Sequence, residues 1–163
     1  MKELLDKLTS YNLFNYLLPG VVFAALAQRL TKYSFTQSDL VIAAFTYYFI
    51  GLVISRLGSL FIEPLLKRFK FVKFADYRDF VGASKMDQKI EILSEANNSY
   101  RTLSALFASL LMLKAYEQLE KLFPWISAYS IIVLLFLLLM MFLFAYRKQT
   151  AYIVKRIEAN LKK

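Results

Sequence analysis

The chain contains no cysteine and no histidine among its 163 residues. Without cysteine there is no disulfide and no thiolate nucleophile, and zinc or haem ligation through either residue is excluded. The same absence removes a histidine general base and the Ser-His-Asp triad. No group of carboxylates has metal-ligand spacing. We therefore expect a protein that is not an enzyme, with no catalytic, cofactor-binding or metal site.

Glycine is also scarce, with four residues in the chain, and Gly82 is the only one between Glu63 and Arg101. A glycine-rich phosphate loop is therefore absent from that segment. Apolar residues, by contrast, make up 58% of the chain, and mean hydropathy is +0.45. A soluble domain is about 45–50% apolar. The excess lies in long runs, which predict a membrane protein.

These runs predict an all-α fold, a polytopic transmembrane helical bundle forming one membrane domain over residues 1–163. The clearest run, 124–146, has no charged residue and is long enough for the ~20 residues that a crossing helix needs. The run 40–62 contains a single charge, Arg56, and Ser38 or Asp39 can cap its start. The predicted spans are residues 13–30, 40–62, 102–122 and 124–146.

The first span is the least regular of the four. Residues 13–27 are apolar but short, and Pro19 predicts a break from which the crossing helix starts. Residues 2–11 form an amphipathic lead-in that we expect to lie on the membrane surface. The segment resembles a signal peptide, but Glu3 and Asp6 interrupt the basic leader, so we expect no cleavage.

The third span is apolar only as far as Leu113, and its second half is amphipathic. Three charged residues there, Lys114, Glu117 and Lys121, share one helical face, and Glu117 precedes Lys121 by the favourable spacing of four. They line an aqueous vestibule, or they belong to a helix end that projects beyond the bilayer.

The distribution of positive charge predicts the topology. Net charge is +9, and Lys and Arg gather in two segments, eight in residues 63–101 and six in residues 147–163. The two intervening loops hold two each. Basic loops stay in the cytoplasm, so we expect both termini and a cytoplasmic loop at 63–101 on that side of a bacterial inner membrane, with 147–163 as a basic cytoplasmic tail.

The cytoplasmic loop is expected to be helical. Ser84 to Asp87 reads as a capping box, and Asp76 to Phe80 suits a short helical turn. The helix after the capping box reaches Ala96 and can run on into the third span. Four polar residues mark the point of membrane re-entry, either as an anchor or as a binding site for a partner: Asn97, Asn98, Tyr100 and Arg101.

Arg56 lies inside a predicted span, where a charge is costly and points to function. Glu63 follows seven residues later, nearly two helical turns, so both are expected to face the same way about 10 Å apart. No acidic residue lies three or four positions from Arg56, so a close partner must come from another helix or subunit. Arg56 either braces a cytoplasmic mouth or extends to headgroup phosphates.

The second span also carries small side chains at helical spacing, and helices in lipid associate through such faces. The stripe predicts self-association or packing within one subunit. Its members are Ala44, Gly51, Ser55, Gly58 and Ser59.

The layout resembles the small four-span membrane subunits of bacterial anti-phage and abortive-infection systems, through GLVISRLGSLFIEPLL, SEANNSYRTL and the last span ending in AYRKQT. The resemblance implies a membrane effector or sensor with a cytoplasmic trigger. We expect a self-associating, channel-like or membrane-perturbing protein. The alternative is a non-conducting sensor or scaffold that docks a cytoplasmic protein through residues 70–101. The expected partners are membrane lipids, further copies of the chain and such a protein, but no nucleic acid.

Overall fold

A computed structural model describes residues 12–161 of the chain. Most of these residues are helical and none of them lies in a strand, so the all-α prediction is confirmed for this part. The lead-in predicted at residues 2–11 lies outside the described residues. The elements, with η denoting a π-helix, are η1 (Leu13–Leu17), α2 (Leu18–Leu30), α3 (Leu40–Leu57), η2 (Gly58–Ile62), α4 (Glu63–Arg68), α5 (Tyr77–Met86), α6 (Lys89–Leu122) and α7 (Ile126–Leu161).

Within residues 12–161, three continuous helical stretches are long and apolar enough to cross a membrane: Leu13–Leu30, Leu40–Arg68 and Ile126–Leu161. They correspond to the first, second and last predicted spans. α6 is longer than two of them, but the charged residues of its second half keep it below the same standard of apolarity. The described part of the chain thus has three candidate membrane-spanning helices.

Both π-helices end two residues before a proline, Pro19 after η1 and Pro64 after η2. Proline has no N–H, and its ring clashes with the carbonyl four residues earlier. A π turn is wider, and here the Glu63 N–H reaches five residues back to the Gly58 carbonyl. The helices therefore continue through both prolines, and the break predicted at Pro19 is wrong.

Aspartates cap α3 and α5, the two helices that follow the longer loops. The Asp39 carboxylate accepts the N–H groups of Val41 and Ile42 at 2.8 and 2.9 Å, which confirms Asp39 as the cap of α3. Asp76 caps α5 in the same way. The capping box predicted from Ser84 is wrong, because Ser84 lies inside α5 and Asp87 instead accepts the N–H of Lys89 at 2.9 Å.

The helices of the first two predicted spans, α2 with η1 and α3, cross in backbone contact. A Cβ atom added to Gly51 would lie 1.7 Å from the Tyr16 carbonyl oxygen, and one added to Gly20 would lie 1.7 Å from that of Tyr47. Only glycine fits at such a crossing. The buried core formed where α6 joins these helices consists of Phe23, Ala27, Ile54, Ala105, Leu106 and Leu110.

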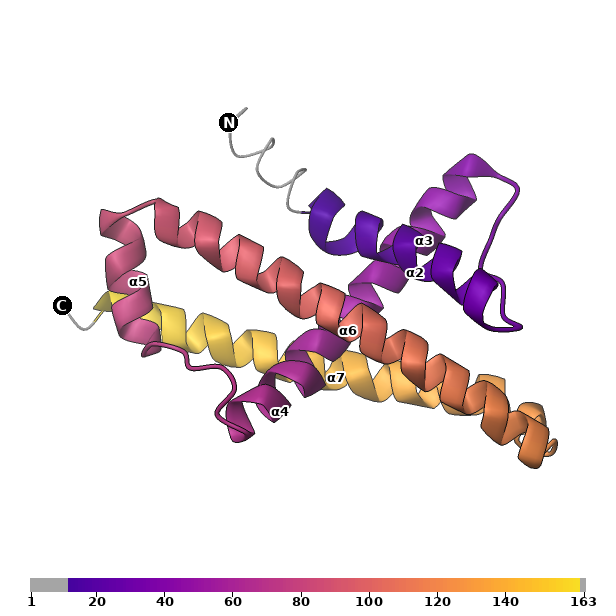
Figure 1. Ribbon diagram of the computed structural model, residues 1–163. Helices are drawn as coiled ribbons and strands as arrows, with labels where there is room; N and C mark the ends of the chain where they lie inside the picture. The colour runs from indigo at the N-terminus through magenta and orange to yellow at the C-terminus, as the bar shows by residue number, and fades with distance from the viewer. Residues whose placement is uncertain (1–11, 162–163) are drawn as a thin grey trace.

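α7 lies apart from this core. Figure 1 shows α6 and α7 as two long antiparallel helices, with α5 bridging their ends and the α3–α4 helix running obliquely across them. Of the most apolar stretch of α7, 11% is buried, and Met141 is the one buried residue among those described in this helix. The helix contacts the rest of the chain mainly through its second half. Residues 147–161 continue it as one helix.

Candidate functional site

Glu63 is the centre of a buried ion-pair cluster at the end of the second span. Its carboxylate is 2.8 Å from Lys67, 2.8 Å from Arg101 and 3.7 Å from Lys148, and the residue is 6% exposed. These cations come from α4, α6 and α7. We call the four residues the Glu63 cluster. A carboxylate buried at this level needs charge-assisted hydrogen bonds to offset its lost hydration, and here Lys67 and Arg101 donate them while Lys148 adds an ion pair.

The π-helix η2 explains why Glu63 faces α6 and α7. A π turn contains about one more residue than an α turn, which rotates the following side chains by roughly 100°. Arg56, before η2, instead donates to the Tyr16 hydroxyl of η1 at 3.2 Å. Its partner does come from another helix. Arg56 and Glu63 were expected to face the same way. In the described contacts, however, Arg56 binds η1, whereas Glu63 binds cations of α4, α6 and α7.

The small-residue stripe is used mostly inside the chain. Gly51 packs on the backbone of Tyr16, and a Cβ on Gly58 would lie 3.2 Å from the Arg101 carbonyl oxygen. Ser55 is buried and accepts a hydrogen bond from Thr102 at 3.4 Å. Ser59 accepts from the Lys148 ammonium through its hydroxyl and its carbonyl, at 2.8 and 2.5 Å. Ala44 alone is exposed.

The four residues predicted at the membrane re-entry lie on different sides of α6, which runs through them without interruption. Arg101 turns inward to Glu63, and the Asn98 carbonyl accepts the Thr102 hydroxyl at 2.9 Å. Asn97 and Tyr100 are exposed. These residues therefore do not form one site, and the asparagines do not cap a helix.

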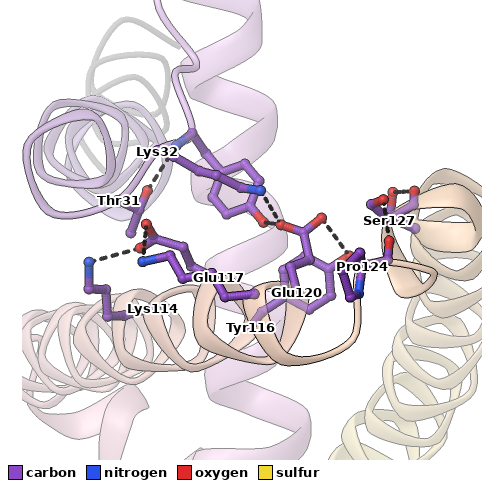
Figure 2. Close-up of polar contacts among 11 residues, drawn as sticks. Thr31, Lys32, Lys114, Tyr116, Glu117, Glu120, Pro124 and Ser127 are labelled. Atoms are coloured by element: carbon purple, nitrogen blue, oxygen red, sulfur yellow. Dashed lines mark hydrogen bonds and ion pairs between the residues drawn. The ribbon is translucent and has the colours of Figure 1, made fainter.

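A second buried cluster lies at the other end of α6 (Figure 2). Glu117 binds Lys114 at 2.8 Å and Lys121 at 3.6 Å, so the predicted common face of these three residues is confirmed. The Lys114 ammonium also donates to the Leu30 carbonyl at 2.7 Å, at the end of α2. Lys114, on this shared face, thus caps the C-terminus of α2, since a cation near a helix C-terminus binds its last carbonyls.

Glu120 completes this cluster and was not singled out by the sequence. It is 2.5 Å from the Lys32 ammonium and accepts hydrogen bonds from the hydroxyls of Tyr33 and Tyr116, the latter at 3.4 Å. Figure 2 shows these groups meeting between α6 and the loop after α2. The signal for Glu120 was its position three residues after Glu117, on the same helical side. Two of its partners, Lys32 and Tyr33, lie more than eighty residues away, and no local pattern marks them.

Burial, together with the Glu120 carboxylate, raises the pKa of Tyr33 well above its ordinary value. The phenol therefore keeps its proton, and its O–H donates a hydrogen bond to the Glu120 carboxylate. We call Glu117, Glu120 and their partners the Glu117–Glu120 cluster. Each cluster joins helices through a buried carboxylate, and the two lie sixteen residues apart on α6 from Arg101 to Glu117, about 24 Å along the helix.

Fold and clusters together define a class: residues 12–161 are all-helical, hold three helices long and apolar enough to cross a membrane, and contain two clusters of buried ion pairs that join helices. Compared with protein-family models, with curated proteins and with solved structures, the chain matches none.

Proposed function

We propose that the protein is an integral membrane protein of four spans, with α6 as the third. Residues Thr102 to Leu113 carry no charge, and the ionised groups at each end of this stretch are held in the two clusters. The clusters are separated by about 24 Å along α6. That length is close to the ~30 Å of hydrocarbon in a bilayer, so each cluster is near one interface. The basic segments 63–101 and 147–163 then face the cytoplasm, in a bacterial inner membrane.

The function that the geometry favours is that of a self-associating, channel-like or membrane-perturbing effector. The observation that carries the proposal is α7, an apolar helix of 36 residues that packs little against its own chain. The stripe of the second span is occupied internally, so copies would associate through α7. The described part of one chain encloses a cavity of about 20 Å³ beside Arg56, which is room for about one water. We place the conducting passage between copies, along α7.

The test measures the mass of the oligomer and the leak of dye through a membrane. The full chain is held in nanodiscs for native mass spectrometry and in dye-loaded vesicles. The double variant Ile132→Ala, Leu139→Ala truncates two large side chains on one face of α7, because residues seven apart share a face. Leu40→Ala, at an exposed position of α3, is the matched control. We expect a closed oligomer and leak for the wild type and the control, and a monomer without leak for the double variant. A wild-type monomer without leak would contradict the proposal.

One observation favours a non-conducting scaffold as the second candidate. The corner between α5 and α6 exposes large apolar side chains outside the three long apolar stretches: Met86, Ile92 and Leu93 are 89%, 60% and 67% exposed. Such a patch in water suits a protein partner. The scaffold predicts a monomer that never leaks, and a defined cytoplasmic partner that Leu93→Lys releases and Tyr100→Lys retains.

A role in antiviral defence rests on the architectural resemblance alone. It predicts that cells expressing the chain survive phage challenge better than cells expressing the Ile132→Ala, Leu139→Ala variant. Equal plating efficiency of the two strains would remove this part of the proposal.

A further inference from the structure

An apolar groove runs between the second span and α7, next to the Glu63 cluster. Its volume is about 440 Å³, within the range of small-molecule sites. The apolar lining comes from η2 and α7, and two cations stand at its edge. The lining residues are Leu60, Phe61, Phe144, Arg147, Lys148 and Ala151. The small cavity beside Arg56 adjoins it and shares Leu60 and Lys148.

The charge around this groove is unbalanced. Glu63 is one carboxylate against Lys67, Arg101 and Lys148, and the described contact of Arg56 is with a neutral hydroxyl. The Arg101 Nε atom is buried without a hydrogen-bond partner. Arg147 makes no hydrogen bond or ion pair within the described chain, and no carboxylate lines the groove or the cavity. Cations concentrated beside a low-dielectric region attract an anion.

The apolar part of the groove identifies the kind of anion. Phe61 and Phe144 are 58% and 49% exposed and lie in the apolar stretches of their helices. Arg147 and Lys148 follow directly at the end of the uncharged run of α7. One continuous surface thus presents hydrocarbon and then positive charge, in the order in which a phospholipid presents its acyl chains and its phosphate. Basic residues at this depth bind anionic headgroups.

We propose that this groove binds one anionic phospholipid, with an acyl chain along Phe61 and Phe144 and the headgroup phosphate at Arg147 and Lys148. The lipid joins α7 to the second span and offsets the positive charge around Glu63. The site is complete in a single chain, so it does not depend on self-association.

The experiment measures lipid binding to the full chain in a non-ionic detergent by native mass spectrometry. Dioleoyl phosphatidylglycerol is compared with dioleoyl phosphatidylcholine, which has the same chains and no net charge. We expect the first phosphatidylglycerol to bind about 25-fold more tightly than phosphatidylcholine, since two cations contribute about fivefold each. Arg147→Gln should weaken phosphatidylglycerol binding about fivefold and leave phosphatidylcholine binding unchanged.

Matched variants separate a specific site from diffuse attraction. Arg156→Gln removes the same charge further along α7, and Phe136→Ala removes an exposed ring outside the groove. Both should bind phosphatidylglycerol like the wild type, whereas Phe144→Ala should weaken the binding of both lipids. Thermal unfolding checks that each variant is folded. If Arg147→Gln is unfolded, the comparison of Phe144→Ala with Phe136→Ala decides whether the groove binds the lipid.

Three results would overturn the proposal. The first is equal binding of the two lipids, and the second is an equal effect of Arg147→Gln and Arg156→Gln. The third is displacement of phosphatidylglycerol by millimolar glycerol phosphate, which would make the groove a site for a free anion rather than for a lipid.

Discussion

Replacing Gly51 by alanine tests the backbone contact between the first two spans. The added Cβ would lie 1.7 Å from the Tyr16 carbonyl oxygen, whereas an ordinary contact is 3.4–4 Å. The helices must therefore separate by nearly 2 Å. A gap of about 0.5–1 Å already removes a quarter to a half of a dispersion contact, and overpacking costs about 1–3 kcal/mol or more. Alanine regains about 0.5–1 kcal/mol as the better helix former. We expect a net loss of about 2 kcal/mol.

The other glycines provide a graded series for the same measurement. Gly20→Ala should match Gly51→Ala, because its Cβ also meets a backbone oxygen at 1.7 Å. Gly58→Ala should be near neutral, since the closest atom is 3.2 Å away. Gly82→Ala, with nothing within 4 Å, should stabilise by about 0.5–1 kcal/mol.

The assay is reversible unfolding of the purified protein in mixed micelles, with native mass spectrometry of each variant. A Gly51→Ala protein that unfolds like Gly82→Ala would refute the close crossing. A loss of oligomer without a loss of monomer stability would show that Gly51 serves association between copies and not packing within one.

Three further predictions concern the polar contacts. Glu63→Gln leaves three cations without their carboxylate and should destabilise the protein by about 3 kcal/mol in the same unfolding assay, whereas the exposed Glu91→Gln should not. Burial and Glu120 raise the folded-state pKa of Tyr33 above 10.0. The contribution of Tyr33 to the free energy of unfolding should therefore be fully present below pH 10 and should fall as pH rises beyond it. Tyr33→Phe should flatten that decline in unfolding titrations, and an unchanged slope would count against the buried phenol. Asp39→Ala removes the cap of α3 and should cost about 1 kcal/mol by chemical unfolding; a change within error would argue that the cap contributes nothing.

Local sequence was sufficient where the determining interaction is local. The uncharged run before Arg147 correctly predicted a last helix long and apolar enough to cross a membrane. Hydrocarbon excludes charge over a length that can be counted along the chain. Asp39 as a cap and the shared face of Lys114 and Glu117 followed from one or two helical turns.

Local rules failed where two helical signals competed. Pro19 predicted a break, but the π turn before it absorbs the clash and the helix continues. Ser84 resembled a capping residue, yet it lies in the last turns of α5, and Asp87 accepts the Lys89 N–H at the start of α6.

The sequence by itself determined that this is an all-helical chain with apolar helices, and which residues carry charge in or near them. Only the tertiary structure decided which of those charges meet: Glu63 with Arg101 and Lys148, and Glu120 with Lys32. The physical reason is that apolar periodicity specifies which face of a helix leaves water. It does not specify which helix covers that face, and buried carboxylates are paired by helix packing between residues far apart in the chain.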